Sequence, residues 1–216
     1  MAKVSPSILA ADFVNLERDI HEIEKSGADW IHVDVMDGSF VPNFSFGLPA
    51  LKAIRGVTDM TLDVHLMIER PIRYVERFVA AGADWLTVHI EADTQENTLE
   101  ALRMIRSMGC KAGISLKPGT RAEEAFPYLT LCDLILVMTV QPGFGGQKFK
   151  EDMMPKLSAL RRVLDEANPG CLLSVDGGID SRTAPVCKAN GAGILVTGSA
   201  FFRAPDRAAY VRELQG

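Results

Sequence analysis

Short apolar segments rich in β-branched residues alternate along the chain with segments that carry apolar residues at helical spacing. The apolar segments predict eight β-strands, whose first residues are 23 to 37 positions apart, a spacing typical of repeated strand–helix units. The predicted strands are 4–9, 30–36, 62–67, 85–90, 110–116, 134–140, 171–175 and 194–196. Because strands joined through helices run in the same direction, the pattern predicts a parallel sheet.

The segments between these strands predict helices, and several end in the same way. The helical patterns are 14–26, 71–81, 95–107, 152–167 and 205–214. Gly27, Gly82 and Gly191 are each followed by Ala and then by a predicted strand, and glycine at that place is typical of a left-handed helix end. Eight such units, without a G-x-G-x-x-G motif after the first strand, favour a single (β/α)8 TIM barrel domain over residues 1–216, and not a doubly wound sheet.

Polar residues interrupt the apolar pattern of three predicted strands, always at alternating positions. They are His32 and Asp34 in 30–36, Asp63 and His65 in 62–67, and Ser174 and Asp176 at the end of 171–175. The apolar residues between them must face the helices, so these polar side chains face the barrel interior, near its C-terminal mouth. Burying such groups without partners costs several kcal/mol, so they need either each other or a cation.

Two histidines and two aspartates in this set match the ligands of a metal ion. We predict that His32, Asp34, His65 and Asp176 hold one divalent metal, because imidazole nitrogen and carboxylate oxygen suit Zn²⁺, Fe²⁺, Mn²⁺ or Co²⁺. The alternative is a hydrogen-bonded polar cluster in the barrel core without a metal.

The other histidines and nearby acids receive plainer interpretations. His21 is expected to be a solvated residue on a helix, and His89 to face the cavity in a supporting or packing role. Asp37, Asp63 and Glu91 are expected to be structural.

Glycine clusters follow three late strands and predict a phosphate site. The residues are Gly143, Phe144, Gly145 and Gly146 after 134–140, Gly177 and Gly178 after 171–175, and Gly198 and Ser199 after 194–196. Barrels of this type bind phosphate at these loops, where glycine lets backbone N–H groups approach an anion closely. A short helix at 199–202 is expected to complete the site.

Charge and composition narrow the classes of function. The formal net charge is −5, and the basic residues are scattered, which argues against a nucleic-acid partner. The chain has no apolar run of membrane length and no secretory leader pattern, so we expect no membrane partner and a cytoplasmic location. The 4 cysteines are far apart in sequence and are expected to be buried thiols.

Five motifs in the chain resemble the ribulose-phosphate 3-epimerase family, in order and over nearly the whole length. They are SPSILAADF at 5–13, HVDVMDG at 32–38 with FVPN at 40–43, DVHLM at 63–67, PGFGGQ at 142–147 and VDGG at 175–178.

The resemblance implies an isomerase of the pentose phosphate pathway in carbohydrate metabolism. It would interconvert D-ribulose 5-phosphate and D-xylulose 5-phosphate at C3 through a metal-stabilised enediolate, with Asp34 and Asp176 as the two acid/base groups. It also implies that His32, Asp34, His65 and Asp176 bind the metal. The implied substrate contacts are Ser7, His65, Met36, Met67, Met138, Gly143, Phe144, Gly145, Gly146, Gly177, Gly178, Gly198 and Ser199.

Two departures from the family pattern keep alternatives open. Lys117 stands where Asn is expected, and Gln141 precedes the Pro-Gly-Phe loop, so a six-carbon ketose phosphate such as D-allulose 6-phosphate is a second possible substrate. A barrel decarboxylase would need lysine in place of His65, and a non-catalytic sugar-phosphate-binding barrel would not need two inward aspartates. We also expect a homo-oligomer.

Overall fold

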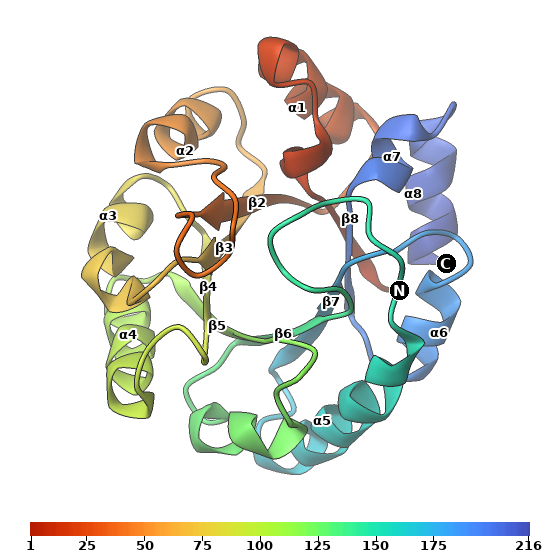
Figure 1. Cartoon of the computed structure of the whole chain (residues 1–216). Helices are drawn as coiled ribbons and strands as arrows, with labels where there is room; N and C mark the ends of the chain where they lie inside the picture. Colours follow the sequence, from red (N-terminus) through yellow and green to blue (C-terminus); the bar gives the residue numbers. More distant parts are fainter.

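The computed structural model describes residues 1–216, in which eight parallel strands form an inner ring and helices surround it (Figure 1). The strands are β1 Lys3–Pro6, β2 Trp30–Met36, β3 Thr61–Met67, β4 Trp85–His89, β5 Lys111–Leu116, β6 Leu134–Met138, β7 Leu172–Asp176 and β8 Ile194–Thr197. Their order is β1-β8-β7-β6-β5-β4-β3-β2, and a parallel bridge between Ser7 and His32 links the end of β1 to β2. The predicted (β/α)8 barrel is therefore confirmed.

The helices of the outer ring are short and alternate with the strands. The α-helices are α1 Leu16–Lys25, α2 Leu48–Arg55, α3 Val75–Ala80, α4 Gln95–Ser107, α5 Met154–Ala167, α6 Ala184–Ala189, α7 Ser199–Arg203 and α8 Arg207–Gln215. The 3₁₀ turns are η1 Ile8–Ala10, η2 Phe13–Asn15, η3 Pro71–Arg73, η4 Ala122–Tyr128 and η5 Glu151–Met153. Glycines 27, 82 and 191 have φ of +76°, +110° and +102°, as the three repeated Gly-Ala joints predict.

Apolar residues form the face of the strands that packs against the helices. The larger apolar cluster lies between the strands and the helices, and it includes Ile31, Val33, Leu62 and Val64. These residues alternate along β2 and β3 with the inward-facing polar residues, so burial of the apolar face fixes which side chains enter the barrel.

Some element boundaries differ from the expectations. The first strand ends at Pro6, because the Ser7 side chain accepts a hydrogen bond from the Leu9 N–H at 3.3 Å and caps η1. The patterns at 14–26, 71–81 and 152–167 each begin with a 3₁₀ turn before the α-helix. The sequence patterns did not predict α2, η4 and α6, which have 8, 7 and 6 residues and give little helical periodicity.

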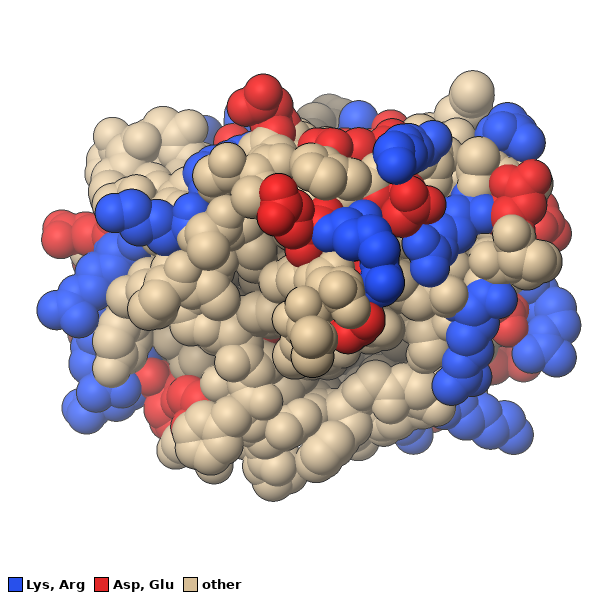
Figure 2. All heavy atoms as spheres, turned by 90° about the horizontal axis from the view of Figure 1, so that it is seen from above, with Lys and Arg blue, Asp and Glu red and all other residues tan.

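The outer surface carries both signs of charge. Figure 2 shows acidic and basic side chains interspersed over the upper part and the sides of one face, around an uncharged area at its lower centre. No helix is both long enough and apolar enough to cross a lipid bilayer.

Candidate active site

A cavity of about 880 Å³ opens at the C-terminal ends of the strands. The segment between β6 and α5 arches over this mouth (Figure 1). Asp34 and Asp176 line the cavity, whereas His32 and His65 are fully buried beside them. Its lining also includes Ser7, Met36, Met67, Met138, Gly143, Phe144, Gly145, Gly146, Gly177, Gly178, Gly198 and Ser199. The structure thus brings the residues predicted for the substrate and for the metal to one place.

The two histidines and two aspartates form one compact cluster at the floor of the cavity. His32, Asp34, His65 and Asp176 each offer a ligand atom, and these four atoms all lie within 4.8 Å of one another. Parallel pairing places Asp34 of β2 directly beside His65 of β3, because the two strands pair in register. Asp176 approaches from the end of β7, farther around the ring.

The imidazole of His32 is held from behind by Asp63. Its Nδ1 atom lies 2.7 Å from Oδ2 of Asp63, and the strand register pairs the same two residues. Its Nε2 atom faces the cluster, 3.2 Å from Oδ1 of Asp34, but has no hydrogen-bond partner. Although burial opposes charge, Asp34 and Asp63 raise the pKa of His32 above its ordinary value.

The surroundings shift the pKa values of the two aspartates of the cluster in opposite directions. The pKa of Asp176 is raised to about 7 by burial and by the negative charge of Asp34. Burial acts in the same direction on Asp34, but the contacts with His32 and His65 outweigh it and lower the pKa of Asp34 below its ordinary value. Ser7 donates a hydrogen bond from Oγ to Oδ2 of Asp34 at 2.6 Å, which further holds that carboxylate. Without a metal, Asp176 therefore holds a proton more readily than Asp34.

The donor set of the cluster fits a divalent metal ion. The buried Nε2 of His32 lacks a partner, and Oδ1 of Asp34 lies between this atom and Nδ1 of His65, which is 3.1 Å away. Buried polar atoms without partners are costly, and a cation among them would satisfy nitrogen and oxygen together. Two imidazoles and two carboxylates form a ligand set that Zn²⁺, Fe²⁺, Mn²⁺ or Co²⁺ accepts.

His89 and Glu91 extend the cluster away from the cavity. Nε2 of His89 lies 2.9 Å from Nε2 of His65, and Nδ1 of His89 lies 3.0 Å from Oε2 of Glu91. Burial lowers the pKa of His89 to about 4. Burial works against the ionisation of Glu91, but hydrogen bonds from His89 and its other neighbours lower the pKa of Glu91 to about 2.

The sequence alone assigned only structural roles to Asp63 and Glu91, yet both contact the histidines of this site. For Asp63 an indication was present, because alternation puts it on the inward face together with His65. For Glu91 the chain offered only its position two residues after His89. His21 is partly exposed on α1 beside Glu24, as predicted.

Three methionines contribute to the apolar part of the cavity wall. Met36 and Met67 end β2 and β3, and Met138 ends β6. All three line the cavity and are almost fully buried. Their flexible apolar side chains can pack against a substrate and keep water away from the two aspartates.

The glycine loops adopt backbone conformations that other residues rarely reach. Gly178 has φ of +67°, and a Cβ atom there would lie 2.7 Å from the backbone nitrogen of Phe149. Gly146 has φ of +73°, and the side chain of Gln147 pins the same loop by donating to the carbonyl oxygen of Phe144 at 2.8 Å. Glycine therefore allows a close approach of the loops around the mouth.

Lys117 lies beside the cavity and does not form part of its wall. Its Nζ atom is 3.5 Å from the ring centroid of Phe40, and its backbone N–H donates to Oε1 of Glu91 at 2.7 Å. Phe40 in turn stacks on His89, with 4.8 Å between the ring centroids.

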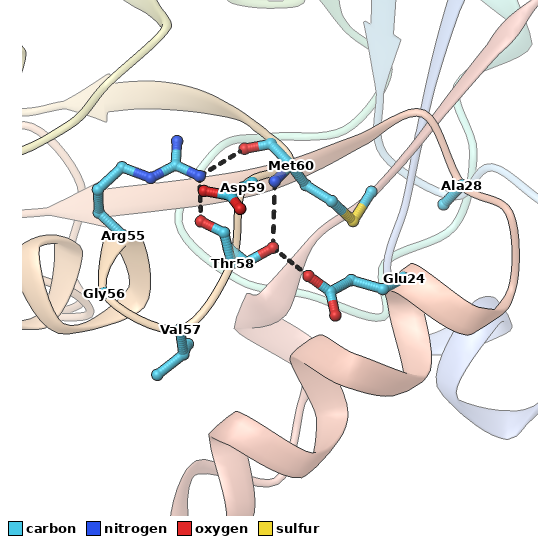
Figure 3. A pocket seen from close by; sticks show the side chains of 8 residues that line it. All are labelled: Glu24, Ala28, Arg55, Gly56, Val57, Thr58, Asp59 and Met60. Carbon is cyan, nitrogen blue, oxygen red and sulfur yellow. Dashed lines mark hydrogen bonds between the residues drawn. The ribbon is translucent and has the colours of Figure 1, made fainter.

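A second hollow, of about 590 Å³, lies between α1 and the segment that joins α2 to β3 (Figure 3). Several of its polar groups are paired with one another: Arg55 donates to the carbonyl oxygens of Thr58 and Met60, and Thr58 donates to Glu24. Arg55 also contacts Asp84 at 3.0 Å. These contacts tie the segment between α2 and β3 to α1 and α2. Arg55, the basic residue of this hollow, is therefore already paired.

The fold and the cluster define the class: a (β/α)8 enzyme whose chemistry lies at the C-terminal mouth of the barrel. A family model described as the ribulose-phosphate 3 epimerase family matches residues 3–202. A protein named ribulose-phosphate 3-epimerase from Bacillus subtilis is 46% identical over 217 residues, covering 100% of this chain and 99% of that protein. Another of that name, from Treponema pallidum, is 46% identical, covering 99% and 97%. The chain belongs to the ribulose-phosphate 3-epimerase family and is an isomerase.

More distant solved structures share the fold. A structure of 3-hexulose-6-phosphate synthase has a TM-score of 0.70 at 19% identity and covers 99% of this chain and 98% of that one. KGPDC from Streptococcus mutans has a TM-score of 0.74 at 14% identity, with coverage of 100% and 96%. At such low sequence identity, these similarities show only that the barrel architecture is shared.

Proposed function

We propose that the chain inverts the configuration at C3 of D-ribulose 5-phosphate to give D-xylulose 5-phosphate, and catalyses the reverse reaction. The observation that carries this proposal is the pair of carboxyl groups at the cavity floor, one from β2 and one from β7, with opposite pKa shifts. Inversion beside a ketone requires one group to remove a proton and another to return a proton to the opposite face. The relatives named ribulose-phosphate 3-epimerase support the same substrate.

A divalent metal is the cofactor of this proposal. His32, Asp34, His65 and Asp176 would hold it, as their converging donor atoms and the unpaired Nε2 of His32 support. When bound, Zn²⁺, Fe²⁺, Mn²⁺ or Co²⁺ supplies Lewis-acid stabilisation of the negative charge that develops on the substrate oxygens.

The proton transfers are assigned to the two aspartates. Asp34, ionised and oriented by Ser7, removes the C3 proton of one epimer, while Asp176 enters the reaction protonated and donates to the opposite face of C3. In the reverse direction the two residues exchange roles. Positioned acid/base catalysis of this kind contributes typically about 10² to 10⁴-fold to the rate.

The glycine loops at the mouth are assigned to the phosphate group. The segment 143–146 and the pairs 177–178 and 198–199 border the same cavity as the aspartates. Their backbone N–H groups can donate to phosphate oxygens without a side chain in the way. Such anchoring would place C3 of a five-carbon chain over the cavity floor.

The six-carbon ketose phosphate is not favoured as a substrate. The curated relatives are named for ribulose phosphate, and Lys117 packs on Phe40 without lining the cavity. A non-catalytic sugar-phosphate-binding barrel is not favoured either, because the relatives are named as enzymes.

A comparison of three substrates tests the proposed reaction. The metal-loaded protein is assayed for C3 epimerisation of D-ribulose 5-phosphate, D-allulose 6-phosphate and unphosphorylated D-ribulose at equal concentrations. We expect the highest kcat/KM for D-ribulose 5-phosphate and the lowest for D-ribulose. A higher kcat/KM for D-allulose 6-phosphate would contradict the proposed five-carbon substrate. Equal kcat/KM values for D-ribulose 5-phosphate and D-ribulose would contradict the proposed phosphate-binding role of the glycine loops.

We also propose that the chain forms a homo-oligomer. Three large apolar side chains are exposed near one part of the mouth: Phe13 by 54%, Val14 by 91% and Phe44 by 77%. Phe13 stacks on Phe46 with 5.0 Å between ring centroids, which places η2 beside the segment that follows β2. Sedimentation velocity should give more than one chain per particle, and a monomer at micromolar concentration would end this proposal.

A further inference from the structure

A line of three side chains runs from the metal cluster toward the outside of the barrel. His65 and His89 are fully buried on neighbouring strands, and their Nε2 atoms are 2.9 Å apart. On its other side, His89 places Nδ1 3.0 Å from Oε2 of Glu91. One imidazole, that of His89, and one carboxylate, that of Glu91, therefore stand in series behind His65, one of the four candidate metal ligands.

The contacts in this line constrain where the protons lie. A nitrogen–nitrogen distance of 2.9 Å requires one proton between the two atoms, so one Nε2 donates and the other accepts. If Nδ1 of His65 is to bind a metal, its lone pair must be free, and the only ring proton of His65 is then on Nε2. His89 must then accept a hydrogen bond from His65 at its own Nε2, and it carries its single proton on Nδ1, which donates to Glu91.

Neighbouring groups hold the outer end of the line in place. Oε1 of Glu91 accepts hydrogen bonds from the Lys117 N–H at 2.7 Å and from the Thr120 hydroxyl, which leaves Oε2 directed at His89. The ring of Phe40 packs against the fully buried His89 at a tilt of 47°. The line is therefore oriented from a fixed carboxylate inward to the cluster.

We propose that His89 and Glu91 are positioning residues, which fix His65 in the tautomer and ring orientation that present Nδ1 to the metal. The inference rests on the metal centre of the proposed function. It gives both histidine ligands carboxylate support, direct from Asp63 for His32 and through His89 for His65. Groups that orient a ligand in this way typically change metal affinity about 10 to 100-fold when they are removed.

Zinc affinity of the folded protein tests the role of the two residues. Zn²⁺ is titrated in competition with a chromophoric chelator, using the wild type, His89→Phe, His89→Gln and Glu91→Gln. His89→Phe keeps a planar ring but cannot accept a hydrogen bond from His65, so the zinc affinity of this variant should fall about 10 to 100-fold. His89→Gln should recover part of this loss, because its amide can accept from His65 and donate to Glu91. Glu91→Gln should lose less than His89→Phe, since its amide oxygen still accepts.

Glu151→Gln is the matched control for charge, because Glu151 also borders the mouth but makes no contact with the line. Its zinc affinity should equal that of the wild type. If Glu151→Gln lost as much affinity as Glu91→Gln, or if His89→Phe bound zinc as tightly as the wild type, the positioning role would be refuted.

Nitrogen NMR of the zinc-loaded wild type reports the tautomers without any substitution. We expect the ring proton on Nε2 of His65 and on Nδ1 of His89; a proton on Nε2 of His89 would overturn the inference. The two proposals fail separately. If the wild type bound no zinc, the proposed metal centre would be refuted. If zinc bound with the other tautomer, or if His89→Phe lost no zinc affinity, only the positioning role would be refuted.

Discussion

Asp34 and Asp176 have the same side chain but experience opposite surroundings. Two imidazoles and a serine hydroxyl surround Asp34, whereas Asp176 is subject to desolvation by burial and to the negative charge of Asp34. In the proposed mechanism, this difference in environment separates a base from an acid in one cavity.

Replacing either aspartate with asparagine should strongly slow epimerisation while keeping the shape of the side chain. Asp34→Asn and Asp176→Asn remove proton capacity, so each should lower kcat by about 10² to 10⁴-fold. In heavy water, each variant should retain exchange of the C3 hydrogen mainly in the epimer whose proton faces the remaining carboxylate.

Metal content must be matched in this comparison, because both residues are also candidate ligands. Equal exchange into both epimers by one metal-loaded variant would mean that a single base serves both faces.

The cysteines give an independent test at the residue scale. Burial raises the pKa of Cys110, Cys171 and Cys187 to about 12 and that of Cys132 well above its ordinary value. Because a raised pKa leaves almost no thiolate at about pH 8, the native protein should react very slowly with a thiol reagent. Denaturant should expose 4 reactive thiols. A cysteine that reacts in the native protein at the rate of a free thiol would contradict the packing.

Among the site residues, those that the sequence could predict share one property. His32, Asp34 and His65 alternate with β-branched or leucine residues, so the strand period alone orients them inward. The support from Glu91 depends on the meeting of β3, β4 and the loop after β5. Residue order does not reveal such three-element contacts.

At the scale of elements, the loops after β6, β7 and β8 decide how the mouth can hold an anion. Gly178→Ala adds a Cβ 2.7 Å from the Phe149 nitrogen at a φ of +67°, and a non-glycine residue there costs about 1–2 kcal/mol in conformation alone. The loop must shift, so KM for the phosphate ester should rise about tenfold, the equivalent of ~1.4 kcal/mol.

Gly119→Ala is the control for this prediction, because Gly119 follows β5, has no positive φ and has open space at its Cβ position. Steady-state kinetics should give an unchanged KM for Gly119→Ala. A KM for Gly178→Ala that equals the control would show that the loop does not contact the phosphate.

The strands were predictable as elements, but several helices were not. Apolar β-branched runs mark β2 and β3 almost to the residue, and α4 agrees with its predicted bounds of 95–107. Helices α2 and α6 have only 8 and 6 residues, too few for a helical period to stand out. Their position in the ring follows from the barrel and not from their own sequences.

For the whole molecule, closure of the barrel is what assembles the site. The bridge between Ser7 and His32 joins the first strand to the second and brings the Ser7 hydroxyl to Asp34. Asp176 reaches the same cluster from β7, much later in the chain. The order of strands predicted this convergence in outline, but the atom that each ligand presents depends on register and packing.

Metal removal tests the central claim most directly. The protein is stripped with a chelator, dialysed and assayed for conversion of D-ribulose 5-phosphate to D-xylulose 5-phosphate while a divalent metal is added back in known amounts. The account predicts no turnover in the stripped protein and recovery that saturates at one metal ion per chain, since His32, Asp34, His65 and Asp176 form a single cluster. Full turnover in rigorously metal-free protein would contradict it.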